Sequence, residues 1–218
     1  MNDLLARHKT LLLDMDGTLL DLAYDNHFWL QTMPAAYAEA QSVSMDIARD
    51  KILSMIEAER GTLNWYCLDF WSDALSLDVL ALKSTCEEPI QFLAGAPEFL
   101  KRARSAGHEL IIVTNSSPEL LKLKDQVTQV TDLVDAAYSS GEFEAPKESP
   151  IFWERFAARS GIRKEACLLV DDSPSVLQAG VDFGLGGVIG INHPDSKRAP
   201  NALTDWPSVD GVKDLLLA

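Results

Sequence analysis

The sequence of 218 residues has no run of about 18 consecutive apolar residues, the minimum for a membrane-spanning helix. The segment from Met1 to Lys9 carries scattered charges and has no apolar stretch of signal-peptide length. With only ten prolines, twelve glycines and 47% apolar residues, the composition argues against disorder and favours one large packed unit or two smaller ones. We therefore expect a soluble, cytoplasmic protein.

Cysteine is scarce as well. The three cysteines, Cys67, Cys86 and Cys167, are odd in number, widely spaced and outside any CxxC pattern. This usage favours a reducing compartment over a disulfide framework. Because each cysteine lies in an apolar segment, we expect three buried thiols.

The chain also has little positive charge. Nineteen lysines and arginines face 33 aspartates and glutamates, which leaves a net charge of −14. Such a surface repels phosphate backbones and anionic lipid, so binding to nucleic acid or to a membrane surface is disfavoured. The expected partner is a small molecule or one whose charge a metal ion neutralises. The oligomeric state stays open, with a monomer as the simplest expectation.

Short apolar runs alternate with helical patterns over most of the chain. The runs that predict strands cover residues 9–13, 109–113, 136–139, 167–170 and 187–191. Prolines that open helices, often behind a serine N-cap, occur at Pro97, Pro118, Pro150 and Pro174. Strands that alternate with helices imply a parallel sheet covered by helices on both faces.

Residues 22–91 lack this alternation. Apolar residues there recur at helical spacing, as at Ala48, Ile52 and Ile56, and no strand pattern interrupts the block. The simplest fold is an α/β protein with a Rossmann-like parallel sheet. We expect residues 1–20 and 93–218 to form this core and residues 21–92 to form a small inserted α-helical cap domain.

Polar residues follow four of the predicted strands, either directly or after a short loop. In chain order these clusters are Asp14 and Asp16, then Thr114 and Asn115, then Lys147, then Asp171 and Asp172. In an open parallel sheet the ligand site lies beyond the carboxyl ends of the strands. Each cluster alone has an ordinary explanation, such as a solvated turn, a helix cap or a surface lysine. Together, in this order, they predict one site.

The residue types in these clusters indicate phosphoryl chemistry beside a metal ion. Several carboxylates in one crevice repel each other unless a cation neutralises them, and oxygen ligands favour Mg²⁺. The predicted metal site comprises Asp14, Asp16, Asp171 and Asp172, with the position of Asp16 contributing a backbone carbonyl. An amine and a hydroxyl suit an anion that shares the metal. The predicted phosphoryl-binding residues are accordingly Thr114, Asn115 and Lys147.

Two of the carboxylates have predicted chemical roles. Asp14, at the strand end, would act as the nucleophile and form an aspartyl-phosphate, which divides one difficult displacement into two easier ones. Asp16 would protonate the leaving alkoxide and later deprotonate the attacking water. Lys147 and Thr114 complete the predicted catalytic set, because they would hold the oxygens of the phosphoryl group.

These motifs resemble those of the haloacid dehalogenase (HAD) superfamily. The sequence Asp-Met-Asp-Gly-Thr at residues 14–18 is similar to its first motif, Thr114 to its second, Lys147 to its third, and the acidic pair at residues 171–172 to its fourth. The helical block directly after the first motif looks like the small cap of that superfamily. The resemblance implies a core that carries the chemistry, a cap that shapes the leaving-group pocket, and phosphatase as the commonest activity.

A narrower resemblance supplies a substrate. Residues 21–29, 63–72 and 146–148 resemble the corresponding parts of bacterial purine 5′-nucleotidases that act on GMP and IMP. A magnesium-dependent purine nucleotidase is therefore the expected function. A sugar-phosphate phosphatase or phosphomutase of the same superfamily is the enzymatic alternative, and an inactive metal-binding or interaction module is the alternative from another class. Base preference and 5′ versus 3′ selectivity stay open.

Aromatic residues are frequent in the predicted cap and could stack on a purine, as Trp29, Trp65 and Trp71 illustrate. A helical unit of this size also needs large side chains to fold, so we expect most of these rings in its core. The polar residues that could hydrogen-bond a base or ribose there are Asn26, Arg60 and Asn64.

Overall fold

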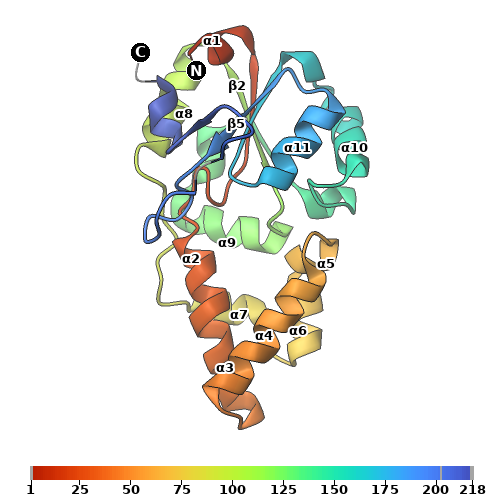
Figure 1. The fold of residues 1–218 in the computed structure, drawn as a ribbon. Coiled ribbons are helices and arrows are strands. Elements are labelled where there is room, and N and C mark those ends of the chain that lie inside the picture. The colour runs from red at the N-terminus through yellow and green to blue at the C-terminus, as the bar shows by residue number, and fades with distance from the viewer. Residues whose placement is uncertain (1, 202, 217–218) are drawn as a thin grey trace.

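The computed structural model describes residues 2–201 and 203–216; the remaining positions of the predicted core segments, 1, 202 and 217–218, lie outside the described residues. A six-stranded, all-parallel sheet forms the upper half of the molecule in Figure 1, in the order β3-β2-β1-β4-β5-β6. The strands are β1 (Thr10–Leu13), β2 (Glu109–Thr114), β3 (Ala136–Ser139), β4 (Cys167–Asp171), β5 (Gly187–Ile191) and β6 (Ser208–Val209). The predicted Rossmann-like α/β fold is confirmed.

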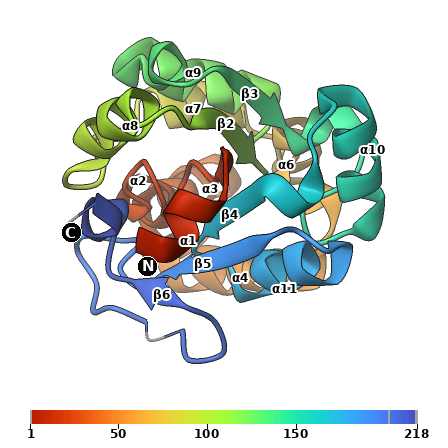
Figure 2. The same ribbon diagram turned by 90° about the horizontal axis from the view of Figure 1, so that it is seen from above.

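Helices cover both faces of this sheet. They are α1 (Asn2–Arg7), α8 (Ala96–Ser105), α9 (Pro118–Thr128), α10 (Pro150–Ser160) and α11 (Pro174–Phe183). Figure 2 shows α8 and α9 on one side of the sheet and α10 and α11 on the other. Each of these four helices has a proline in its first turn, where the missing N–H needs no partner. Short 3₁₀ turns lie at Val130–Leu133, Ser140–Phe143, Lys164–Ala166 and Val212–Leu216.

The central strand β1 is buried on both faces. Leu11 and Leu13 pack into a core that includes Phe99 on α8, whereas Leu12 faces the opposite core with Phe152 on α10. Alternate strand residues point to opposite faces of a sheet, which is why consecutive leucines serve both cores. A fully apolar strand therefore ends abruptly where the polar residues begin.

Helices alone occupy residues 23–84. They are α2 (Ala23–His27), which continues through a π-helical turn (Phe28–Thr32) into α3 (Met33–Gln41), followed by α4 (Met45–Glu59), α5 (Leu63–Tyr66), α6 (Leu68–Leu75) and α7 (Val79–Ser84). We call these elements the helical end; Figure 1 shows them grouped below the sheet. Trp71 is fully buried in their core against Phe28 and Ile52, as the helical pattern predicts.

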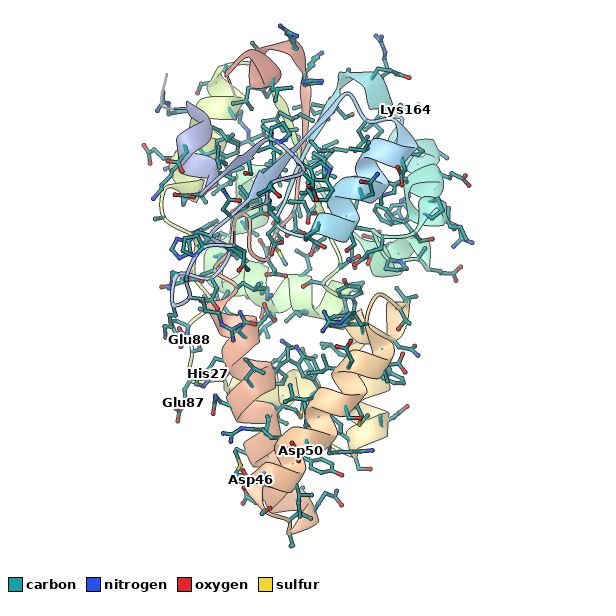
Figure 3. All side chains as sticks on the ribbon, viewed as in Figure 1. His27, Asp46, Asp50, Glu87, Glu88 and Lys164 are labelled. Atoms are coloured by element: carbon teal, nitrogen blue, oxygen red, sulfur yellow. The ribbon has the colours of Figure 1, made fainter. Side chains whose placement is uncertain are left out.

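The loop after β5 contacts both chain segments that lead into and out of the helical end. Asp21 accepts hydrogen bonds from the backbone N–H and the hydroxyl of Ser196, at 3.0 and 2.5 Å. Lys197 forms an ion pair with Glu88 at 2.5 Å. Figure 3 places Glu88 at the level where the helical end meets the sheet. These contacts hold the two connections side by side.

Some features differ from the sequence prediction. Cys167 is buried as expected, but Cys67 and Cys86 are half-exposed, so the prediction of three buried thiols is wrong for two of them. Cys67 lies at the start of α6, where its sulfur accepts a hydrogen bond from the N–H of Phe70. A residue at the end of a short helix can thus be partly exposed even where its neighbours in the sequence are apolar. Helix α1 and the short strand β6 were not predicted.

None of the helices in the described part of the chain has both the length and the apolarity needed to cross a bilayer.

The aromatic packing of α10 generates a stability prediction. Phe152 is fully buried and contacts the rings of Phe143, Trp153 and Phe156. Replacing Phe152 with alanine should lower the free energy of unfolding by about 3–5 kcal/mol, because it leaves a cavity in the core. The neighbouring Ile151 is 50% exposed, so Ile151→Ala should cost less than about 1 kcal/mol. Urea denaturation of both variants measures the difference, and equal losses would contradict the packing described.

Candidate active site

The predicted site residues meet at the carboxyl end of the sheet. Strand β1 lies between β2 and β4, which is the point where the strand order reverses and where open α/β sheets bind ligands. A cavity of about 750 Å³ lies there. It is lined by all of the predicted site residues, namely Asp14, Asp16, Thr114, Asn115, Lys147, Asp171 and Asp172.

The ammonium group of Lys147 is the centre of this site. It donates hydrogen bonds to Asp14, to Asp171 at 2.7 Å and to the carbonyl oxygen of Val113 at 3.0 Å. Its side chain is 2% exposed, so these partners replace water around a buried charge. The backbone carbonyl of Lys147 accepts a hydrogen bond from the indole N–H of Trp153 at 2.7 Å. One lysine therefore bridges the ends of β1, β2 and β4.

Three carboxylates surround this ammonium group. Oxygen atoms of Asp14, Asp171 and Asp172 all lie within 4.8 Å of one another, which makes them a possible divalent-cation site. The pKa of Asp14 is raised to about 7, because burial together with the charges of Asp171 and Asp16 outweighs the opposing effect of Lys147. Burial and the charges of Asp14 and Asp171 raise the pKa of Asp172 as well. The cluster holds more negative charge than one lysine balances, as a cation site requires.

Gly17 allows the turn after β1 to approach this cluster. Its φ of +90° lies in the left-handed region, and a Cβ atom there would come within 2.7 Å of the Asp172 carboxylate and 2.9 Å of Pro194. Only glycine fits such a conformation and such a close approach. The glycine of the first motif is therefore explained by packing against the acidic pair.

Asp16 lies in the cavity wall with both carboxylate oxygens engaged. One oxygen accepts from the ammonium group of Lys124 at 2.5 Å and the other from the hydroxyl of Ser116 at 2.6 Å. Its side chain thus stands apart from the three-carboxylate group. Metal binding through the backbone at this position stays a prediction. Thr114 is buried, and its hydroxyl oxygen accepts from the N–H of Ser116 at 3.0 Å.

Asn115 holds the loop that carries Lys147. Its side-chain oxygen accepts from the N–H of Lys147 at 2.9 Å, and its amide group donates to Glu148 at 3.0 Å. The other oxygen of Glu148 accepts from the hydroxyl of Tyr66 in the helical end at 2.7 Å. Both the oxygen and the amide nitrogen of the Asn115 side chain, predicted to bind substrate, therefore form hydrogen bonds within the protein, and these bonds fix the position of Lys147.

Apolar and aromatic residues of the helical end form the opposite wall of the cavity. Trp29 and Trp65 line it, and the guanidinium group of Arg60 lies over the Trp65 ring at 4.9 Å. Asn26 also lines the cavity and donates to Asp195 at 2.6 Å. Asn64 is exposed and outside this lining. Of the three tryptophans, Trp71 is buried in the core as expected, Trp29 packs against that core and also lines the cavity, and Trp65 lines the cavity.

Comparison with known proteins places the chain in a family. The model of the haloacid dehalogenase-like hydrolases matches residues 8–184. The chain belongs to this family. It is 34% identical over 207 residues to the GMP/IMP nucleotidase YrfG of Escherichia coli (strain K12). The matched region covers 95% of this chain and 93% of the relative. The protein of the same name from Shigella flexneri matches equally well. The chain is thus a HAD hydrolase of phosphoric monoesters.

Solved structures show how widely this fold is shared. A HAD phosphatase from Thermococcus onnurineus has a TM-score of 0.76 at 23% identity and covers 95% of both chains. An L-2-haloacid dehalogenase from Xanthobacter autotrophicus has a TM-score of 0.62 at 17% identity and covers 95% of this chain and 96% of its own. The fold therefore serves more than one chemistry, and the side chains of the site must distinguish them.

Charged residues around this HAD site were missed by sequence reasoning. Lys124 on α9, Asp25 on α2 and Lys83 on α7 form ion pairs beside Asp16. Burial alone would raise the pKa of Asp25, but the charges of Lys124 and Lys83 hold it well below its ordinary value. The sequence does contain an indication that Lys124 is buried, because this lysine lies four residues after the apolar Leu120 and thus on the apolar stripe of its helix.

The raised pKa of Asp14 predicts how stability depends on pH in the metal-free protein. As pH falls, the folded state takes up a proton on Asp14 at about pH 7, whereas the unfolded chain does so only near its ordinary pKa of 3.8, so stability falls as pH rises from about 4 to about 7 and stays low above that. Asp14→Asn removes this charge. In EDTA at pH 8 the variant should unfold at a higher temperature than the wild type, by about 2–4 °C for each kcal/mol of relief. The difference should shrink as pH falls and should vanish below about pH 4, where the unfolded chain is protonated as well.

Thermal unfolding by circular dichroism measures this effect. Asp50→Asn is the matched control, because Asp50 is exposed on α4 in the helical end (Figure 3). The control should show no such pH-dependent gain. A lower unfolding temperature for Asp14→Asn than for the wild type at pH 8 would contradict the electrostatics described for the cluster.

Proposed function

We propose that this HAD hydrolase is a magnesium-dependent nucleotidase that removes phosphate from purine nucleoside 5′-monophosphates through an aspartyl-phosphate on Asp14. One observation carries the proposal: the cluster of Asp14, Lys147 and Asp171 opens into a cavity of about 750 Å³ with aromatic walls. That volume lies within the usual range for small-molecule sites. The 34% identity to a GMP/IMP nucleotidase over nearly the whole of both chains supports the choice of substrate.

Asp14 has the position of a nucleophile. It directly follows the buried strand β1, and its backbone N–H donates to the carbonyl of Val170 on β4 at 2.9 Å, so its main chain is fixed. A carboxylate oxygen of Asp14 would attack phosphorus, and the bond from phosphorus to the ester oxygen would break. Lys147 and Thr114 would hold the transferring phosphoryl oxygens, because Lys147 contacts Asp14 and Thr114 ends β2, the strand beside β1, and both line the cavity.

The chemistry of the donor set fits Mg²⁺. Asp14, Asp171 and Asp172 offer hard oxygen ligands, and burial together with neighbouring carboxylates raises their pKa values, a penalty on the charged forms that a divalent cation would offset. These three residues would hold the ion, with a backbone carbonyl near Asp16. When bound, magnesium supplies positive charge that screens the acids from the phosphoryl group.

Asp16 would act as the general acid in the first step and as the general base in the second. In the first step it gives its proton to the departing ester oxygen, which leaves as a neutral alcohol. In the second step it takes a proton from the water that attacks phosphorus, and the bond between phosphorus and the Asp14 oxygen breaks, which releases inorganic phosphate. Asp16 ends protonated and Asp14 ends free, so the cycle closes without any further reactant.

The helical end would act as a cap, with residues 21–92 as its extent and residues 1–20 and 93–218 as the catalytic core. Trp29 and Trp65 give the cavity two aromatic faces on which a purine could stack. The hydrogen bond between Tyr66 and Glu148 ties this wall to the loop of Lys147. A sugar-phosphate phosphatase or phosphomutase would use the same core, so the walls of the cavity decide the substrate.

Phosphate release from a panel of esters tests the proposed function. With magnesium, GMP and IMP should be hydrolysed faster than AMP, UMP and several sugar phosphates, and EDTA should abolish release from all of them. Faster hydrolysis of a sugar phosphate would favour the enzymatic alternative. No release from any ester would favour a binding module that keeps the fold without turnover.

Replacing Asp16 with asparagine tests the proton-transfer role. A ribose hydroxyl leaves poorly without a proton, so turnover of GMP should fall by about 10²–10⁴-fold, the usual contribution of general acid–base catalysis. An activated aryl ester such as p-nitrophenyl phosphate needs little protonation and should lose much less in its first step. The ratio kcat/KM measures both effects, because it covers only the steps up to departure of the leaving group and not the hydrolysis of the aspartyl-phosphate that both esters share. Equal losses on the two esters would exclude Asp16 as the acid.

A further inference from the structure

Four charged side chains form a row between the sheet and the helical end. Lys124 donates to Asp16 at 2.5 Å and to Asp25 at 2.6 Å, and Lys83 donates to the other oxygen of Asp25 at 2.8 Å. The row therefore alternates in sign, from Asp16 through Lys124 and Asp25 to Lys83. Its two positive and two negative groups balance each other.

The contact between Lys124 and Asp25 joins the sheet and its covering helices to the helical end. Asp16 belongs to the turn after β1, and Lys124 belongs to α9, which covers the sheet. Asp25 and Lys83 belong to α2 and α7 of the helical end. Figure 1 shows α9 at the end of the sheet nearest to α2 and α7, and α7 packs against α9. Lys124 is the residue whose ammonium group joins a carboxylate from each part.

The four charged side chains at this junction are largely shielded from water. The side chains of Lys124 and Lys83 are each 1% exposed, and those of Asp16 and Asp25 are 16% and 17% exposed. A buried ammonium group is strongly disfavoured unless carboxylates surround it. Lys83 also faces the rings of Phe28 at 4.2 Å and Tyr24 at 5.2 Å. Lys124 therefore depends on Asp25, and so on the position of α2, for half of its compensating charge.

We propose that Lys124 is a positioning residue, which orients the Asp16 carboxylate for proton transfer only while Asp25 of the helical end is in place. This role rests on the proposed function, since it presupposes that Asp16 is the general acid and base. Lys124 holds one oxygen of Asp16, and the other oxygen, which accepts from the Ser116 hydroxyl, would be the one that exchanges the proton with a ligand in the cavity that Asp16 lines. If the helical end moves away, Asp25 leaves with it and Lys124 loses the second anchor that fixes this geometry.

The physical basis is the short range of proton transfer. A general acid must lie about 2.6–3.2 Å from the atom that it protonates, so a small rotation of the Asp16 carboxylate removes it from reach. Packing of α2 and α7 against α9 would thus orient the Asp16 carboxylate for proton transfer at the same time as it closes the cavity. Nucleophilic attack by Asp14 does not require Lys124, because Asp14 is held separately by Lys147.

Two aryl esters separate this role from a purely structural one. Phenyl phosphate has a poor leaving group and depends on Asp16, whereas p-nitrophenyl phosphate depends on it little. Lys124→Met keeps the length of the side chain but loses both ion pairs. Its kcat/KM for phenyl phosphate, which excludes the shared hydrolysis step, should fall by about tenfold or more relative to its kcat/KM for p-nitrophenyl phosphate, in the same direction as for Asp16→Asn. Asp25→Asn should shift the ratio the same way.

Matched variants complete the experiment. Lys122→Met removes an exposed lysine from the same helix and should leave both rates unchanged. The double variant with Lys124→Met and Asp25→Asn should shift the ratio no further than Lys124→Met alone, because both residues act through one contact. If Lys124→Met does not fold, Asp25→Asn decides, since it changes a single carboxylate to an amide of equal size.

Equal losses on the two esters in folded Lys124→Met and Asp25→Asn would overturn the positioning role, and so would an unchanged ratio in Asp25→Asn. The nucleotide panel with the wild-type protein keeps this outcome distinct from failure of the proposed function. If the wild type hydrolyses the aryl esters but no nucleotide, the proposed substrate is wrong while the ratio still decides the role of Lys124. If it hydrolyses neither, both proposals fall.

Discussion

The site depends on one buried ammonium group, that of Lys147, at the ends of three neighbouring strands. Asp14 and Asp171 follow or end adjacent parallel strands, so the register of the sheet brings two like charges together. Lys147 offsets part of their repulsion, and the carbonyl of Val113 and the indole of Trp153 fix the lysine in turn. The remaining negative charge is what the proposed function would balance with a divalent cation, which could then share an anionic substrate with Lys147.

The sequence was sufficient to predict those residues that directly follow strands. Asp14, Thr114 and Asp171 could be placed because an apolar run ends at each, and parallel strands bring their carboxyl ends to one edge. Burial of Lys124 could be inferred from the apolar stripe of its helix, but its contact with Asp25 could not, because that contact joins two helices that are far apart in the sequence. The bonds of Asn115 to the Lys147 loop also arise only from tertiary structure, and its predicted role in substrate binding stays a prediction.

The helical end completes the site in two ways. It supplies the aromatic walls of the cavity through Trp29 and Trp65, and it contacts the catalytic loops through Tyr66 and Asp25. Dehalogenases and phosphatases share this fold. Under the proposed function, the second acid at Asp16 and the acidic pair at residues 171–172 would carry the distinction in chemistry. The core would then determine the reaction, and the helical end would determine which ester reaches it.

Trapping the covalent intermediate tests the central claim most directly. The protein would be mixed with ³²P-labelled GMP and magnesium, quenched in acid within milliseconds, digested and mapped by mass spectrometry. The label should lie on the peptide that contains β1, at Asp14, and should disappear when unlabelled substrate is added before the quench. Label on a different residue, or turnover of GMP by the Asp14→Asn variant at the wild-type rate, would contradict nucleophilic attack by Asp14.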